Sequence, residues 1–159
     1  MAEINWEKAN SVYKTAICAF ESDDLKYDRD DGNLTIKSGF NGDDFNMEFI
    51  LKVNAEKEVV QLFSVLPFKV PEDKRVDLAI AICAANYGLV NGSFDYDISD
   101  GSIIFRMTTS YKDSIIGIEL IKYMIYVSIG TVDSYNDKFF MIGKNMMSVQ
   151  DFMKNEDQN

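Results

Sequence analysis

The residues of this chain best able to do chemistry are two clusters of carboxylates, at 28–31 and 95–100, each followed by a glycine. Carboxylates that converge can bind calcium, or can act as an acid and a base in a cleft. Neither cluster has the residue order of a calcium loop. Its twelfth position, which needs an acid, is Gly39 in the first cluster and Arg106 in the second. We therefore favour solvated turn residues and expect no metal.

Other catalytic and phosphate-binding chemistry lacks the residues that it needs. The chain contains no histidine, which excludes Ser-His and Cys-His nucleophile pairs and histidine-containing metal sites. It also lacks the GxxxxGKS/T order of a phosphate loop. Cys18 and Cys83 are single residues on predicted apolar helix faces, so we expect both to pack in the core. The sequence thus predicts neither a cofactor nor a catalytic residue.

Composition and charge limit the classes of partner. The 159 residues suffice for one domain with a substantial core, and 47% of them are hydrophobic. The net charge of −10 argues against nucleic acid and anionic membranes, which bind clustered Lys and Arg. Residues 1–7 lack the basic and apolar stretches of an export signal, and the most apolar run, 114–129, contains Glu119 and Lys122. We therefore expect a cytoplasmic protein that does not span a membrane.

Two segments of the chain, 25–37 and 94–106, resemble each other at a constant offset of 69 residues. They share Tyr, Asp, Asp and Gly, and their apolar and basic positions match in kind. Asp-Gly between two alternating apolar runs predicts a β-hairpin, because glycine adopts the positive φ of a tight turn. A helical pattern precedes each copy. The chain is therefore either a duplicated helix–hairpin unit or two hairpins that converged on the same turn chemistry.

Hydrophobic periodicity predicts the elements around these hairpins. A first helix is predicted from Ile4 to Phe20, with an apolar stripe of Trp6, Ala9, Tyr13, Ile17 and Phe20. Residues 45–53 alternate as a strand with one buried face, and a second apolar strand begins at Glu58 and is ended by Pro67. Pro71 is predicted to open the next helix, whose buried stripe is Val76, Ile80, Cys83 and Tyr87.

Two carboxy-terminal helices are predicted, the first capped by Asp113 and ended by Gly130. The second repeats apolar residues every three or four positions, at Val132, Tyr135, Phe139, Ile142, Met146, Val149 and Met153. Together these elements predict an α+β fold with an antiparallel sheet of about five strands and helices on one face, in the order α-β-β-β-α-β-β-α(-α). One domain is expected over 1–154, with 131–154 as an additional helix and 155–159 as a flexible tail.

Apolar side chains are in excess late in the chain, where Phe and Met residues cluster at 139–153. Methionine-rich faces adapt to varied partners, so these helices are the predicted partner-binding surface. The candidate anchors are Tyr123, Tyr126, Phe139, Phe140 and Met147. The alternative is that these side chains complete the core of the monomer. Whether the helices close on their own sheet or on a second copy stays open.

The stretch 84–106 resembles the YbjN family, whose fold is similar to that of type III secretion chaperones. The matching features are Asn86 near a helix end, a strand, the Asp100-Gly101 turn, and a strand ending in Arg106. The order of elements is similar over residues 4–130. The resemblance implies a bacterial protein-binding module without catalytic residues, because the family is described as regulators of sensory transduction. Secretion chaperones of this fold are acidic cytoplasmic homodimers that hold a client protein.

Two functions therefore compete. The first is a non-catalytic protein-binding module, chaperone-like or regulatory, that captures a protein or peptide through apolar helix and sheet surface. The second is a small-ligand binder or enzyme that uses turn carboxylates in a cleft, namely Asp28, Asp31, Asp97 and Asp100. Carboxylates must converge to do chemistry, so the distance between the two Asp-Gly turns separates the two hypotheses. We favour the first.

Overall fold

A six-stranded antiparallel sheet forms the centre of the molecule in the computed structural model, which describes residues 4–156. The strands are β1 (Asp28–Asp30), β2 (Thr35–Asn41), β3 (Asn46–Asn54), β4 (Val59–Lys69), β5 (Ser93–Asp97) and β6 (Ser102–Ser110). They lie in the order β1-β2-β3-β4-β6-β5, so the two hairpins form opposite edges of the sheet. The predicted antiparallel α+β fold is confirmed, with one strand more than expected.

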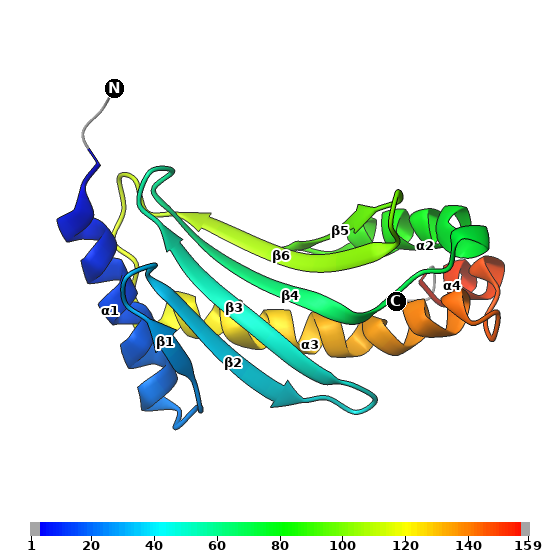
Figure 1. Cartoon of the computed structure of the whole chain (residues 1–159), viewed down its shortest axis with the longest axis horizontal. Coiled ribbons are helices and arrows are strands. Elements are labelled where there is room, and N and C mark those ends of the chain that lie inside the picture. Colours follow the sequence, from blue (N-terminus) through cyan, green and yellow to red (C-terminus); the bar gives the residue numbers. More distant parts are fainter. Residues whose placement is uncertain (1–3, 157–159) are drawn as a thin grey trace.

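Four helices accompany the sheet within the described residues. They are α1 (Trp6–Ser22), α2 (Arg75–Gly88), α3 (Ile118–Gly143) and α4 (Val149–Glu156), and a short 3₁₀ turn, η1 (Glu72–Lys74), precedes α2. Figure 1 shows α3 running behind the strands, with α1 at one end and α2 and α4 at the other. Burial alternates along β3, β4 and β6, and no described helix lies over the face of the sheet opposite to α3 (Figure 1).

The predicted alternation of β3 is confirmed, because Met47, Phe49, Leu51 and Val53 are all buried. The predicted end of the next strand at Pro67 is wrong, since β4 continues to Lys69. Its pairing with β6 changes register between Val65 and Lys69. Proline cannot donate a ladder hydrogen bond, and this irregularity accommodates it.

Helix α1 begins two residues later than predicted, after Asn5, whose side chain accepts a hydrogen bond from the Lys8 N–H. Alanines at 9, 16 and 19 occupy its buried face beside Tyr13 and Phe20, while Trp6 is 55% exposed. Both cysteines are exposed, so the prediction that Cys18 and Cys83 pack in the core is wrong. In each helix small alanines take the packing positions, which lets the helix approach its neighbours closely.

The predicted buried stripe of α2 is also wrong. Pro71 precedes η1, and α2 begins at Arg75. Its buried residues are Leu78, Ala81, Ile82 and Ala85, whereas Val76, Ile80, Cys83 and Tyr87 are exposed. The helix is apolar on both sides, so hydrophobic periodicity alone could not identify the side that faces the core.

Helix α3 is a single element of 26 residues that passes through Gly130, where a break was predicted. It starts at Ile118 rather than after Asp113, and the chain turns only at 144–148, before α4. A glycine inside a helix costs about 1 kcal/mol. Burial of large residues on both sides of Gly130, including Ile125 and Phe139, outweighs that cost. Residues 131–143 therefore continue α3, and α4 reaches Glu156, inside the predicted tail; residues 157–159 lie outside the described part.

The two similar hairpins use the same loop length in different places. Four residues separate the strands in each hairpin, and the last of the four has positive φ: Leu34 at 49° and Gly101 at 79°. Under the sequence alignment Leu34 would match Ile103, two positions past Gly101. Residues that the sequence alignment matches therefore occupy different positions in the two turns. This favours two hairpins that converged on similar turn residues over a duplicated unit.

Candidate functional site

The two carboxylate clusters lie far apart. Thr35 of β2 aligns through β3 and β4 with Thr108 of β6, whereas the β5–β6 turn ends at Ser102. Six residues along a strand span about 20 Å, and three strand spacings add about 14 Å across the sheet. Within residues 4–156 no group of three His, Cys, Asp or Glu residues is placed to hold a metal. The proposed cleft between the Asp-Gly turns is therefore wrong.

Hydrogen bonds within each turn account for the carboxylates. Asp30 accepts bonds from the backbone and side chain of Asn33, and Asp97 accepts bonds from Ser99. Asp100 pairs with Lys69 and accepts a bond from the Ser102 N–H. These bonds, led by the one from Lys69, hold the pKa of Asp100 well below its usual range. A carboxyl group that stays ionised cannot supply a proton near neutral pH. The hydrogen bonds of these carboxylates lie within the turns, so their role is to stabilise the turns.

Only two of the five predicted anchors are substantially exposed. Tyr123 and Tyr126 on α3 are 43% and 48% exposed. The Tyr123 hydroxyl accepts a hydrogen bond from the Asn91 amide, and the Tyr126 hydroxyl donates one to Asp23. Their polar ends are thus engaged within the monomer, which leaves the faces of the rings available for contact.

The other three anchors are buried or partly buried within the monomer. Phe139 is fully buried, with its ring centroid 5.0 Å from that of Phe94, so it cannot be a surface anchor. Phe140 is half-buried in an aromatic cluster with Phe45 and Phe68, and Met147 packs partly buried against the core. The alternative that late apolar residues complete the core therefore holds for Phe139. The late helical segment closes on its own sheet.

An exposed apolar row on α2 was missed because the sequence analysis placed it in the core. We call Val76, Ile80, Cys83 and Tyr87 the α2 stripe. Val76, Ile80 and Tyr87 are 66%, 46% and 95% exposed. Ile80, Cys83 and Tyr87 of the stripe line one wall of a groove of about 650 Å³, and Met153 and Glu156 of α4 line the other wall.

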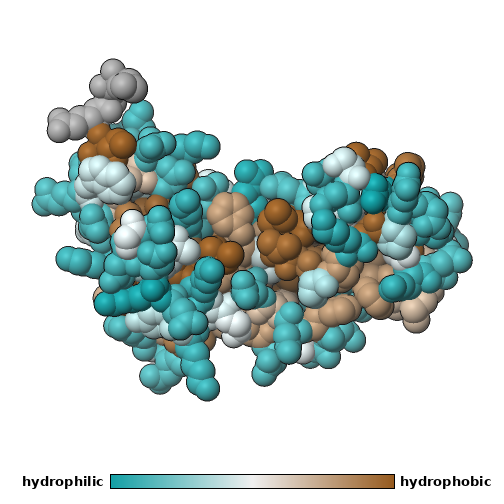
Figure 2. Space-filling model, in the orientation of Figure 1, coloured by the Kyte–Doolittle hydropathy of each residue, from teal (hydrophilic) through white to brown (hydrophobic). Residues whose placement is uncertain are grey.

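A second apolar surface lies on the bare face of the sheet. We call Ile50, Phe63, Val65 and Ile104 the sheet patch. Ile50 faces Phe63 across β3 and β4, and Val65 faces Ile104 across β4 and β6. Figure 2 shows apolar side chains gathered over the middle of this face, surrounded by hydrophilic ones. The sequence predicted binding through apolar helix and sheet surface in general terms, but it did not single out these four residues.

Charged side chains of both signs frame the sheet patch. Lys37 lies beside Ile50 on β2, and Arg106 lies beside Phe63 on β6. Arg106 forms an ion pair with Asp95 at 2.8 Å, and Asp95 lies beside Ile104. An apolar centre with a mixed-charge rim is typical of surfaces that bind protein segments.

The β5 edge of the sheet is closed to an added strand at Phe94. The Asn86 side-chain amide donates to the Phe94 carbonyl at 3.0 Å, and the Phe94 N–H donates to Asn86 Oδ1 at 2.8 Å. One side chain thus takes both backbone bonds that another strand would need at this position. The opposite edge strand, β1, has only three residues. Contact across the bare face is therefore better supported than β-addition.

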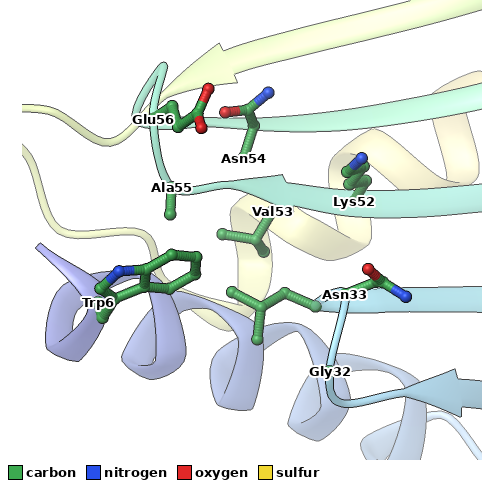
Figure 3. Close-up of a pocket in the computed structure, with 9 residues that line it drawn as sticks. Trp6, Gly32, Asn33, Lys52, Val53, Asn54, Ala55 and Glu56 are labelled. Atoms are coloured by element: carbon green, nitrogen blue, oxygen red, sulfur yellow. The ribbon is translucent and has the colours of Figure 1, made fainter. Parts of the chain in front are cut away.

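A smaller pocket of about 330 Å³ lies where α1 meets the β1–β2 and β3–β4 turns. Figure 3 shows the Trp6 ring and the Ala55 and Val53 side chains turned toward one another, while Asn54 and Glu56 point away. Polar groups that do not converge cannot position a substrate for reaction. The pocket therefore does not restore the enzyme hypothesis.

No helix in the described part of the chain combines the length and the apolar character that crossing a membrane requires. The sequence model of the YbjN family, described as "Putative bacterial sensory transduction regulator", matches residues 19–141. None of the curated proteins matches the chain.

Several solved structures share the fold, and two of them are described here. The crystal structure of YbjN from E. coli superimposes with a TM-score of 0.57 at 8% identity, covering 77% of this chain and 87% of that chain. The HopA1–SchA chaperone–effector complex contains a chain with a TM-score of 0.56 at 12% identity, covering 81% of this chain and 95% of that chain. At such identities the likeness concerns the fold alone.

Proposed function

This chain belongs to the YbjN family, and on that premise we propose that it is a non-catalytic protein-binding module, chaperone-like or regulatory. Its partner is a protein or peptide rather than nucleic acid or membrane, in keeping with the net charge of −10. The family description, a bacterial sensory transduction regulator, and the acidic composition support a bacterial, cytoplasmic setting.

The observation that carries this proposal is the sheet patch. The helices leave one face of the sheet bare, and that face has an apolar centre instead of the polar surface that solvent favours (Figure 2). Val65 is 54% exposed, and the other three residues of the patch are partly exposed. The partner that we propose is an extended segment with apolar side chains that cover the patch and charged flanks that meet Lys37 and Arg106.

The fold comparison supports the same class of function. The HopA1–SchA structure is a complex of a chaperone with an effector protein, and one chain of that complex shares this fold. We transfer only the class of partner, a protein, and no residue roles.

Tyr123 and Tyr126 supply a second set of candidate anchors on the outer side of α3. Tyrosine rings offer a large contact area with few torsions to immobilise, so exposed pairs are common in binding surfaces. They lie on the helical side rather than the bare sheet face, and separate variants can test each surface.

The test is an affinity capture from lysate of the protein's own host, followed by titration of the recovered partner in purified form. We compare the wild type with Val65→Asp and with Tyr123→Ala/Tyr126→Ala, and use Ile115→Asp, 97% exposed in the loop before α3, as the matched control. A charge placed at the centre of a contact costs at least about 2 kcal/mol, or roughly thirtyfold in affinity.

We expect Val65→Asp to weaken binding by that factor while Ile115→Asp leaves it unchanged. Loss only in the tyrosine variant would move the site to α3 and refute the role of the sheet patch. A wild-type protein that captures no specific partner would overturn the proposal.

A further inference from the structure

Helices α2 and α4 pack side by side at one end of the molecule (Figure 1), and the groove between them has a volume of about 650 Å³. This volume falls within the range of about 300–1,000 Å³ that small-molecule sites occupy. Among the described residues that line the groove, one is charged, Glu156, and the others are Ile80, Cys83, Ala84, Tyr87, Gly88 and Met153. The groove therefore combines apolar walls with a single carboxylate.

The width of the groove limits what can enter it. Ala84 and Gly88 lie one turn apart on α2, and a Cβ added to Gly88 would meet nothing within 4 Å, so the space beside them is open. The axes of two packed helices are about 8–10 Å apart, whereas a helix with its side chains is about 10–12 Å across. A further helix is too wide for the space between the walls, and an alkyl chain fits it.

The two helices run in the same direction, so their carboxyl ends lie together. Gly143, before the turn into α4, lies beside the start of α2, because a Cβ on it would be 3.6 Å from the proline that precedes η1. At the other end of the groove, Tyr135 bonds to Glu156. The Tyr135 ring centroid lies 5.6 Å from that of Phe94, which bonds through its backbone to Asn86 near the end of α2. Helices carry partial negative charge at their carboxyl ends, so this end of the groove favours a cation.

Glu156 has no cationic partner in the described part of the chain. Its Oε2 accepts a hydrogen bond of 2.6 Å from the neutral Tyr135 hydroxyl, and it takes part in none of the ion pairs there. Lys154, in the last turn of α4, pairs with Asp151 instead. Lys138 lies over the Tyr135 ring, 5.1 Å from its centroid. A half-buried carboxylate without an opposite charge is stabilised when a cation pairs with it.

We propose that this groove binds a small organic cation, an amine with an apolar chain, whose ammonium group pairs with Glu156 while its chain lies between Ile80 and Met153. The Tyr87 ring lines the same groove and offers a face for contact with the ammonium group. None of the lining residues belongs to the sheet patch or to the carboxylate turns. The ligand site is therefore independent of the protein partner proposed above.

Three probes with the same eight-carbon chain separate the effect of charge from that of apolar contact. They are octylammonium, 1-octanol and octanoate, each titrated into the wild-type protein by calorimetry near neutral pH, below the concentration at which the probe aggregates. We expect octylammonium to bind most tightly and octanoate least tightly, because only the ammonium group pairs with a carboxylate. Shortening the ammonium probe should weaken binding about fourfold for each buried methylene removed.

Cys83 reports occupancy of the groove without any substitution. It lines the groove and is exposed, and Cys18 on α1 is exposed outside it. Bound octylammonium should slow the reaction of Cys83 with N-ethylmaleimide and leave the rate at Cys18 unchanged. Mass spectrometry of the two cysteine-containing peptides measures both rates in one sample.

Glu156→Gln removes the charge and keeps an oxygen that can accept from Tyr135. We expect this variant to bind octylammonium about tenfold more weakly and to bind 1-octanol like the wild type. Glu119→Gln removes an exposed carboxylate of α3 outside the groove and should leave octylammonium binding unchanged, which controls for the general attraction of an acidic protein for cations. Circular dichroism establishes that each variant is folded.

Three outcomes would overturn the inference. They are octylammonium binding that is no tighter than octanoate binding, a reaction rate at Cys83 that octylammonium does not lower, and a Glu156→Gln variant that binds octylammonium like the wild type. The Val65→Asp result decides the proposed function separately, because Val65 lies outside the groove.

Discussion

Two polar side chains on α3 are buried without the partners that burial usually requires. Ser128 and Asn136 are both fully buried, and within residues 4–156 neither the Ser128 hydroxyl nor the Asn136 Nδ2 has a hydrogen-bond partner. A buried polar group left unpaired costs about 1–3 kcal/mol. These two positions are therefore places where the native sequence is less stable than it could be.

We predict that Ser128→Ala raises the free energy of unfolding by about 1 kcal/mol, because it removes an unpaired hydroxyl and leaves only a small void. Urea unfolding followed by circular dichroism measures the change. Ser134→Ala is the control, since Ser134 is exposed on the same helix and bonds to the Gly130 carbonyl. A destabilised Ser128→Ala protein would mean that the hydroxyl has a partner, such as a buried water.

The residues that carried the family resemblance have structural roles. Asn86 caps the β5 edge at Phe94, Gly101 has a φ of 79°, and Arg106 pairs with Asp95. A Cβ on Gly101 would lie 2.3 Å from the Val70 carbonyl oxygen, so no other residue fits there. The residues of this motif therefore stabilise the fold, and the resemblance that they carry is evidence about the fold and not about a catalysed reaction.

Among the helices, α3 is the element whose prediction differed most from the structure. Gly130 is exposed on it, and a Cβ added there would meet nothing within 4 Å. We predict that Gly130→Ala raises the free energy of unfolding by about 1 kcal/mol, through better helix propensity and a less flexible unfolded chain. Thermal and urea unfolding measure the gain.

Gly92→Ala is the control for this prediction, because the same substitution at that position should lower the free energy of unfolding. Gly92 has a φ of 79°, and a Cβ there would lie 2.4 Å from the Phe105 ring. We expect this variant to lose stability, because the new methyl group meets both backbone strain and a buried side chain. Similar effects of the two substitutions would contradict the continuous α3 helix as well as the strained turn.

At the scale of the whole molecule, one ion pair joins parts of the chain 99 residues apart. Asp23, just after α1, pairs with Lys122 on α3 at 2.5 Å and accepts a bond from Tyr126. The bonds from Lys122 and then Tyr126 hold the pKa of Asp23 below its usual value. The carboxylate therefore stabilises the fold above its unfolded pKa of about 3.9, and this contribution is lost as the pH falls through the lower folded pKa.

We predict that Asp23→Asn is less stable than the wild type at pH 7 and that the difference shrinks below about pH 4, where the native carboxyl becomes protonated. Urea midpoints measured from neutral to acidic pH test this. Asp113→Asn, in the exposed loop before α3, should follow the wild-type profile. A difference that is independent of pH would show that the ion pair does not join the two helices.

The sequence by itself determined what local chemistry controls. Alternation at 47–53 placed a half-buried strand, because the side-chain period depends on neighbouring residues only. Asp-Gly placed both hairpins, although the positive φ lies at the glycine only in the second, at Gly101, and at Leu34 in the first. The sequence also argued against histidine-dependent nucleophile pairs and metal sites, because the chain has no histidine, and against calcium loops, because the acidic residues are in the wrong order. The YbjN resemblance followed from one such local stretch.

Tertiary structure alone decided which of two apolar sides is covered. On α2 both sides are apolar, and the smaller alanine side packed inward, leaving Ile80 and Tyr87 in solvent. Burial on each side of Gly130 carried α3 through a residue that local propensity disfavours. The candidate surfaces are the apolar faces of α2 and of the sheet that stay exposed. Which face is buried depends on contacts between residues far apart in the chain, so local sequence patterns could not decide it.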